Sequence, residues 1–100
     1  MAKESLSPQE IDNRLAALPE WSLEDGKITR NYQLTDHFAA TAMVVHVARI
    51  QQELNHHSDL TLGYNTVDIA VNSHDVGGIT DRDFDLAARV EEIAPTHGAL

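Results

Sequence analysis

The 100-residue chain has the length of one ordinary domain, and its 42% hydrophobic and 23% charged residues are typical of a soluble globular protein, so we expect a single domain over residues 1–100. A net charge of −9 and only seven Lys and Arg argue against direct binding to nucleic acid or to an anionic membrane. No apolar run approaches the roughly 20 residues of a membrane span. The absence of cysteine excludes disulfides, thiolate nucleophiles and Cys-type zinc sites.

The two ends of the chain carry few structural signals. The opening stretch MAKESLSPQE lacks the apolar segment of a secretory signal, so we expect a cytoplasmic protein. We also expect the first few and last few residues to be loose ends.

The first predicted element is a helix that begins after Ser7. Ser7 is a good N-cap, Pro8 suits the first helical position, and Glu10 completes a capping box. Pro19 closes the segment. The apolar stripe of this helix consists of Ile11, Leu15 and Leu18.

A hairpin is predicted next, around the pair Asp25-Gly26, which tolerates the positive φ angles of a tight turn. In that register Leu23 faces Ile28 and Trp21 faces Arg30, so the indole and the aliphatic side chains share one face.

A long helix should follow, capped by Thr35 or Asp36 and extending to about Asn55. Its middle, residues 42–48, is apolar on almost every side except at His46. This pattern indicates either a helix that packs between subunits or a helix wholly buried within one subunit.

The second hairpin brings two histidines together. Apolar residues alternate on both sides of a turn predicted at Asn65-Thr66, which gives the two strands a common apolar face. The same register places His57 opposite His74 on the other face of the sheet. The predicted pairs are Tyr64 with Val67, Leu62 with Ile69, and Leu60 with Val71. His56 adjoins this pair through one peptide bond, and the helix end at Asn55 should border the same cavity.

The last predicted helix begins after Thr80, with Asp81 and Asp83 favourably placed in its first turn, and ends at Pro95. Its inward stripe consists of Leu86, Ala87, Val90, Ile93 and Ala94. The order helix, hairpin, helix, hairpin, helix predicts an α+β fold, a four-stranded antiparallel sheet with three helices packed on one face.

Several stretches resemble the signature of the pterin-4a-carbinolamine dehydratases: NHHSD, YNTVDIAVNSH, GGIT and DRD. The resemblance covers most of the chain and implies an α+β fold, a homodimer or homotetramer, and dehydration of 4a-hydroxytetrahydropterin to quinonoid dihydropterin, without a metal or organic cofactor. The chain departs from the family's usual pattern at Ser58, where a proline is common, at Leu60, near a frequent aromatic, and at Gln52, usually acidic.

Carried onto this sequence, the family's catalytic histidines fall on His56, His57 and His74. We assign substrate binding to Asn55, Ser73, Asp75 and Asp83, of which Asp83 matches the family's aspartate at the last helix. Imidazole, with a pKa of about 6.5, can give or take a proton near neutrality, as loss of the 4a hydroxyl requires. Which histidine performs which step stays open.

Two alternatives accompany this hypothesis. The three histidines could bind zinc or iron with Asp59 or Asp75, although adjacent histidines in an extended segment point in opposite directions. The fold could also serve as a non-catalytic assembly factor or transcription cofactor that uses the apolar middle helix. Elsewhere, His37, His46 and His97 are expected to be ordinary surface or hydrogen-bonded residues.

Overall fold

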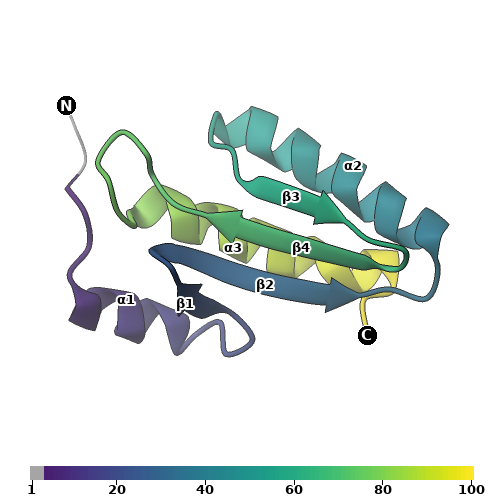
Figure 1. Ribbon diagram of the computed structural model, residues 1–100, viewed down its shortest axis with the longest axis horizontal. Helices are drawn as coiled ribbons and strands as arrows, with labels where there is room; N and C mark the ends of the chain where they lie inside the picture. The colour runs from purple at the N-terminus through teal and green to yellow at the C-terminus, as the bar shows by residue number, and fades with distance from the viewer. Residues whose placement is uncertain (1–3) are drawn as a thin grey trace.

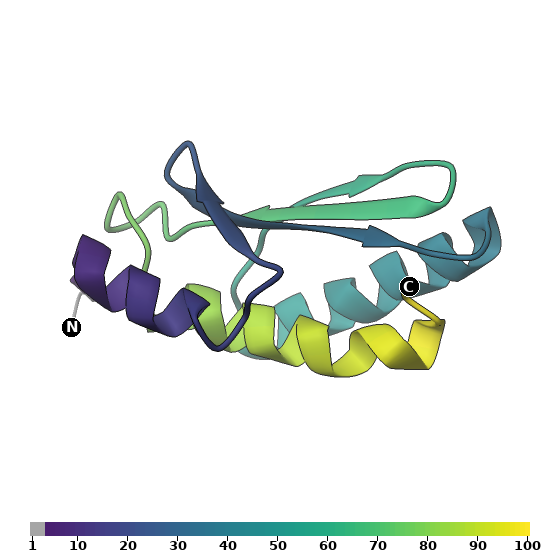
Figure 2. The same ribbon diagram turned by 90° about the horizontal axis from the view of Figure 1, so that it is seen from below.

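The computed structural model describes residues 4–100 and has the predicted α+β architecture, with the helices on one face of an antiparallel sheet (Figures 1 and 2). The elements are α1 (Pro8–Leu15), β1 (Ser22–Glu24), β2 (Lys27–Gln33), α2 (His37–Leu54), β3 (Asp59–Leu62), β4 (Thr66–Val71) and α3 (Asp81–Ile93), followed by a 3₁₀ helix at Ala94–His97.

The sheet has the strand order β1-β2-β4-β3, so β4 is bonded on both sides and β3 is an edge strand. Alternate residues of β4 point toward the helices and are at most 1% exposed: Val67, Ile69 and Val71. These side chains form the core with the buried faces of α2 and α3. The opposite face of the sheet carries no helix within residues 4–100 (Figure 2).

The predicted helix starts are confirmed. Ser7 and Glu10 form a reciprocal capping box, Asp36 caps α2, and Thr80 caps α3. Asp83 completes a second capping box with Thr80, because its carboxylate accepts a hydrogen bond from the Thr80 backbone N–H at 2.8 Å. Local side-chain hydrogen bonds thus fix where each helix begins.

The first hairpin has the predicted register, with Leu23 opposite Ile28. Asp25 and Gly26 both have positive φ, 52° and 77°. The shared apolar face is only partly realised, since Trp21 is 3% exposed but Leu23 remains 44% exposed.

The predicted register of the second hairpin is wrong by two residues. Leu62 pairs with Val67 and Leu60 with Ile69, and the turn extends from Gly63 to Thr66, closed by a 2.9 Å bond from Gly63 N to Thr66 O. Tyr64 therefore lies in the turn and is exposed. A shift of two residues keeps every side chain on its predicted face, so the alternation alone could not detect it.

The middle helix is not wholly buried within one subunit. Met43 and Val47 are fully buried, whereas Phe38 is 82% and Val45 is 66% exposed on the outer face of α2. The interpretation that this helix is completely covered by its own chain is therefore wrong, because the sheet covers only one side of it.

The prediction that the last few residues form a loose end is wrong. The 3₁₀ helix packs against α2, and the Leu100 N–H donates to the Gln33 carbonyl at 2.8 Å. The expected N-terminal loose end falls on residues 1–3, outside the described residues. Within residues 4–100, no helix has the length and apolarity needed to cross a membrane.

Candidate active site

His57 and His74 lie at the same end of the sheet. His57 stands two residues before β3 and His74 three residues after β4. Both side chains are exposed, and both line one cavity of about 120 Å³. The remaining lining residues are Ser58, Asp59, Ala70 and Asn72. The structure therefore brings these two imidazoles to one place on the open sheet face, although the strand register is not the predicted one.

A carboxylate borders this cavity. Lys27 donates a 2.7 Å hydrogen bond to Asp59, and this bond, followed by the charges of Lys27 and His74, holds the pKa of the Asp59 carboxyl below its usual value. Asp59 is therefore an anion beside the two imidazoles near neutral pH.

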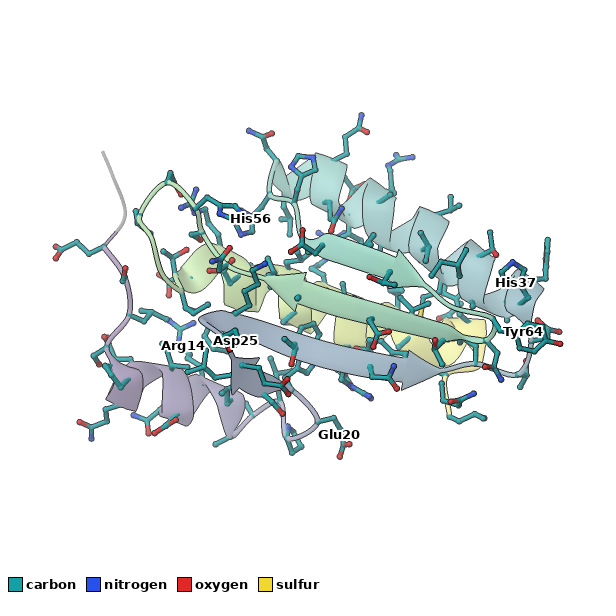
Figure 3. All side chains as sticks on the ribbon, viewed as in Figure 1. Arg14, Glu20, Asp25, His37, His56 and Tyr64 are labelled. Carbon is teal, nitrogen blue, oxygen red and sulfur yellow. The ribbon has the colours of Figure 1, made fainter. Side chains whose placement is uncertain are left out.

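His56 is placed differently. It is 7% exposed, and its Nε2 lies 2.6 Å from Oδ1 of Asp83, which is fully buried. The other oxygen of Asp83 accepts hydrogen bonds from Ser73 Oγ at 2.9 Å and from the Thr80 N–H. Figure 3 shows His56 at the sheet end, close to the loop that leads into α3. Asp83 thus holds the ring of His56 by one of its two nitrogens.

The backbone explains why the neighbouring histidines diverge. Asn55 ends α2 in the left-handed conformation, with φ of 51°, and the chain then leaves the helix without regular structure. Side chains that follow one another in an extended segment point to opposite faces. His57 consequently reaches the open-face cavity, whereas His56 points inward and does not line it. Two of the three histidines, His57 and His74, therefore share the expected cavity, and His56 does not.

The remaining predicted site residues divide into buried and exposed ones. Ser73 and Asp83 are fully buried. Asp83 contacts His56, and Ser73 contacts Asp83 and Thr80. Asn55 and Asp75 are exposed. Asp75 accepts a 2.6 Å hydrogen bond from Arg82, which holds the pKa of its carboxyl below the usual value.

Sequence reasoning missed Arg82, Lys27 and Gln51. Arg82 and Lys27 pair with the two exposed carboxylates. Gln51 is buried, and its Oε1 accepts hydrogen bonds from the Ser58 N–H at 3.0 Å and from the Ser58 hydroxyl. A proline at position 58 has no N–H to make this contact, so serine fixes the loop by hydrogen bonding. In the sequence Gln51 is an ordinary polar residue of a predicted helix, and its partner Ser58 lies outside that helix.

The other histidines behave as ordinary hydrogen-bonded residues, as predicted. His37 Nδ1 lies 2.7 Å from the Tyr64 carbonyl, and His46 Nδ1 lies 2.8 Å from His97 Nε2. Within residues 4–100, no group of three or more His, Asp or Glu side chains is arranged to hold a metal ion.

Comparison with known proteins gives one consistent family. The sequence model of the family described as pterin 4 alpha carbinolamine dehydratase matches residues 4–93. A Streptomyces coelicolor protein named "Putative pterin-4-alpha-carbinolamine dehydratase" is 61% identical over 100 residues and covers 99% of both chains. A Chloroflexus aurantiacus protein of the same name is 46% identical over 88 residues, 88% of this chain and 95% of its own.

Two solved structures share the fold. The crystal structure of a transcriptional coactivator/pterin dehydratase from Brucella melitensis superimposes with a TM-score of 0.86 at 30% identity, covering 91% of this chain and 99% of the other. A pterin dehydratase-like protein identified as a RuBisCO assembly factor in the alpha-carboxysome gives a TM-score of 0.62 at 16% identity, over 74% and 86% of the two chains. The second likeness concerns the fold alone.

Proposed function

Because the chain belongs to the pterin 4 alpha carbinolamine dehydratase family, we propose that it removes water from 4a-hydroxytetrahydropterin to give quinonoid dihydropterin, in pterin cofactor recycling. The observation that carries this proposal is the cavity lined by His57 and His74, beside the buried pair of His56 and Asp83. These groups supply acid-base chemistry and no nucleophile, which suits a dehydration.

The reaction requires two proton transfers. The bond between carbon 4a and the hydroxyl oxygen breaks, the oxygen receives a proton and leaves as water, and a ring nitrogen gives up its proton. Imidazole can give or take a proton, so one of the two open-face rings can serve as the acid and the other as the base. The acid protonates the leaving hydroxyl and the base takes the proton of the ring nitrogen, with no metal or organic cofactor in the proposed reaction.

His56 is the third catalytic histidine of the proposal, positioned by Asp83. A carboxylate that accepts the Nε2–H fixes the orientation of the ring, and Nδ1 is then the acceptor nitrogen of the neutral imidazole. We assign Ser73 to the same support, because it donates to Asp83 from a fully buried position. Asn55 and Asp75, both exposed near this end of the sheet, are the proposed substrate contacts together with the two open-face histidines.

The test is turnover of enzymatically generated 4a-hydroxytetrahydropterin by the purified chain. His74→Ala should lower kcat/KM by roughly 10²–10⁴-fold, the usual effect of losing one acid-base group. The fold should survive, because the His74 side chain is exposed and outside the apolar core. His37→Ala is the matched control, an exposed histidine at the opposite end of the sheet (Figure 3). Equal kinetics of wild type and His74→Ala would contradict the assignment.

The outer face of α2 supports a homodimer or homotetramer. Phe38 and Val45 are large, exposed and two helical turns apart, with the small Ala42 between them. Such a stripe is suited to burial against a second copy. The alternative function, a non-catalytic assembly or transcription cofactor of the same fold, would use the same surface, and an inactive chain that keeps its partner binding would favour it.

A further inference from the structure

The His74 side chain is carried by a tight loop between β4 and α3. A bridge between Ser73 and Gly78 closes this loop, in which Ser73 N donates to Gly78 O at 2.8 Å and Gly78 N donates to Ser73 O at 3.3 Å. Gly77 supplies the positive φ of 66° that the turn requires. We call residues 74–78 the His74 loop. The position of the imidazole in the cavity that it lines depends on how this loop is held.

The start of α3 holds the first part of the His74 loop. At the base of the loop, the buried Ser73 Oγ lies 2.8 Å from Thr80 Oγ1 and donates to Asp83 at 2.9 Å. At its exposed tip, Asp75 accepts a 2.6 Å hydrogen bond from Arg82. These contacts fix the residues on either side of His74, and the end of the loop has a different partner.

The end of the His74 loop is held by residues that precede α1. The Leu6 N–H donates to the Ile79 carbonyl at 2.7 Å, and the Leu6 side chain packs against the core. The Ser5 hydroxyl donates a longer hydrogen bond, of 3.4 Å, to the Val76 carbonyl. Figure 1 shows the two stretches side by side at one end of the molecule. We call Ser5 and Leu6 the N-terminal segment.

Ser5 occupies the space that a side chain at position 78 would need. A Cβ added to Gly78 would lie 2.5 Å from Ser5 Oγ and 3.0 Å from Ser5 Cβ, whereas carbon atoms pack at about 3.5–4.0 Å. The φ of Gly78 is not positive, so its backbone conformation does not require glycine. The N-terminal segment and the His74 loop therefore approach this closely only because residue 78 has no side chain.

We propose that the N-terminal segment positions His74: it packs against Gly78, bonds to Ile79 and so holds the His74 loop where the imidazole reaches the substrate. This inference rests on the proposed dehydratase function. The segment acts through the loop and not on the reacting atoms. An acid-base group must lie within hydrogen-bond reach of its proton, and a displacement of about 1 Å can reduce the rate by up to about 10²-fold. Asn55 and His57 contact the substrate from outside the loop, so the loss should appear in kcat more than in KM.

Gly78→Ala tests the contact, because the added methyl group forces the N-terminal segment and the His74 loop apart. We expect kcat to fall roughly three- to tenfold, with a smaller change in KM. A second measurement is independent of activity. The amides of Val76 and Gly77, which donate to the Ser73 and His74 carbonyls, should exchange faster with deuterated solvent than in the wild type.

Ser5→Gly should rescue the alanine variant, because it removes both atoms that the new methyl group would meet. Alone, Ser5→Gly loses only the long bond to Val76 and keeps the bond from Leu6 to Ile79, so kcat should stay within about twofold of the wild type. In the double variant with Gly78→Ala, kcat and the exchange rates of residues 76 and 77 should return to those of Ser5→Gly. Such a rescue identifies the contact through which the substitution acts.

Gly63→Ala is the matched control. A Cβ at Gly63 would lie 2.3 Å from Thr66 Oγ1, and the φ of Gly63 is not positive, so the substitution creates the same kind of overlap. Gly63 precedes Tyr64 in the turn between β3 and β4, at the end of the sheet opposite His56 (Figure 3). This variant should lose stability to urea, as Gly78→Ala does, but keep the wild-type kcat.

The outcomes separate this inference from the proposed function. An active wild type combined with an unchanged kcat in Gly78→Ala, an equal loss of kcat in Gly63→Ala, or a double variant no better than Gly78→Ala would overturn the positioning role and leave the dehydratase function standing. A wild type without turnover would overturn both.

Discussion

Asp83→Asn is the most informative single substitution, because it removes a buried charge without changing the shape of the side chain. In the wild type, Oδ1 contacts His56, while Oδ2 accepts from Ser73 and from the Thr80 N–H. Asparagine has only one acceptor oxygen. If that oxygen keeps the Ser73 and Thr80 bonds, the amide NH₂ faces Nε2 of His56.

The expected loss in the free energy of unfolding is about 2–4 kcal/mol. Three hydrogen bonds to a charged acceptor, each contributing about 1.5–3 kcal/mol, become two neutral bonds and one reversed bond. The variant no longer has to bury a carboxylate, which offsets part of the loss. The reversed bond makes Nε2 an acceptor and moves the proton to Nδ1, so His56 adopts the opposite tautomer.

The assay pairs urea denaturation with dehydration kinetics. With the tautomer inverted, kcat/KM should fall by roughly 10²–10⁴-fold. Ser73→Ala is the control, because it removes one donor to Asp83, costs about 1.5–3 kcal/mol and keeps both the charge and the tautomer. Its kcat/KM should stay within about threefold of the wild type. If Asp83→Asn were destabilised but equally active, the contact between His56 and Asp83 would be purely structural, and the role proposed for His56 would be wrong.

Three further predictions concern the metal alternative, assembly and pH. Chelator treatment should leave dehydration unchanged, whereas inactivation that zinc reverses would support a metal centre. Sedimentation at micromolar concentration should show at least a dimer that Val45→Asp dissociates, and a wild-type monomer would contradict the α2 interface. Burial, followed by the charge of His46, lowers the pKa of His97 below its ordinary 6.5, so the unfolded chain binds this proton more readily. The contribution of His97 to stability is therefore complete above pH 6.5 and decreases as the pH falls toward the lowered pKa of the folded state. Urea denaturation of the wild type and of His97→Gln at several pH values measures how the free energy of unfolding of the two proteins differs.

The helix starts and the order of helices and hairpins along the chain were predictable because they depend on local chemistry. Ser7, Asp36 and Thr80 each satisfy backbone donors within a few residues, and the sequence contains both partners of each contact. The register of the second hairpin was not predictable, because alternation specifies which face a residue occupies but not its partner. The Gly63–Thr66 turn sets the register, because its hydrogen bond encloses Tyr64 and Asn65 instead of the expected Asn65 and Thr66.

The candidate site was predictable in composition and only partly in arrangement. Alternation correctly placed His57 and His74 on the open face. The contact between His56 and Asp83 joins residues 27 positions apart and depends on how α3 packs beneath the end of the sheet. No local pattern encodes that packing. The pairing of Lys27 with Asp59 has the same origin, because it joins strands β2 and β3, which β4 separates.

The position of β4 in the sheet gives the two open-face histidines different dynamics. β4 is hydrogen-bonded on both sides, and its amides should therefore be among the slowest to exchange with deuterated solvent. β3 is a four-residue edge strand whose other side is unpaired within the described chain, so it should open more often. His74 follows the most protected strand and His57 precedes one of the least protected. Opening of β3 would carry one imidazole away from the other while the core stays closed, which offers a route for substrate entry and product release.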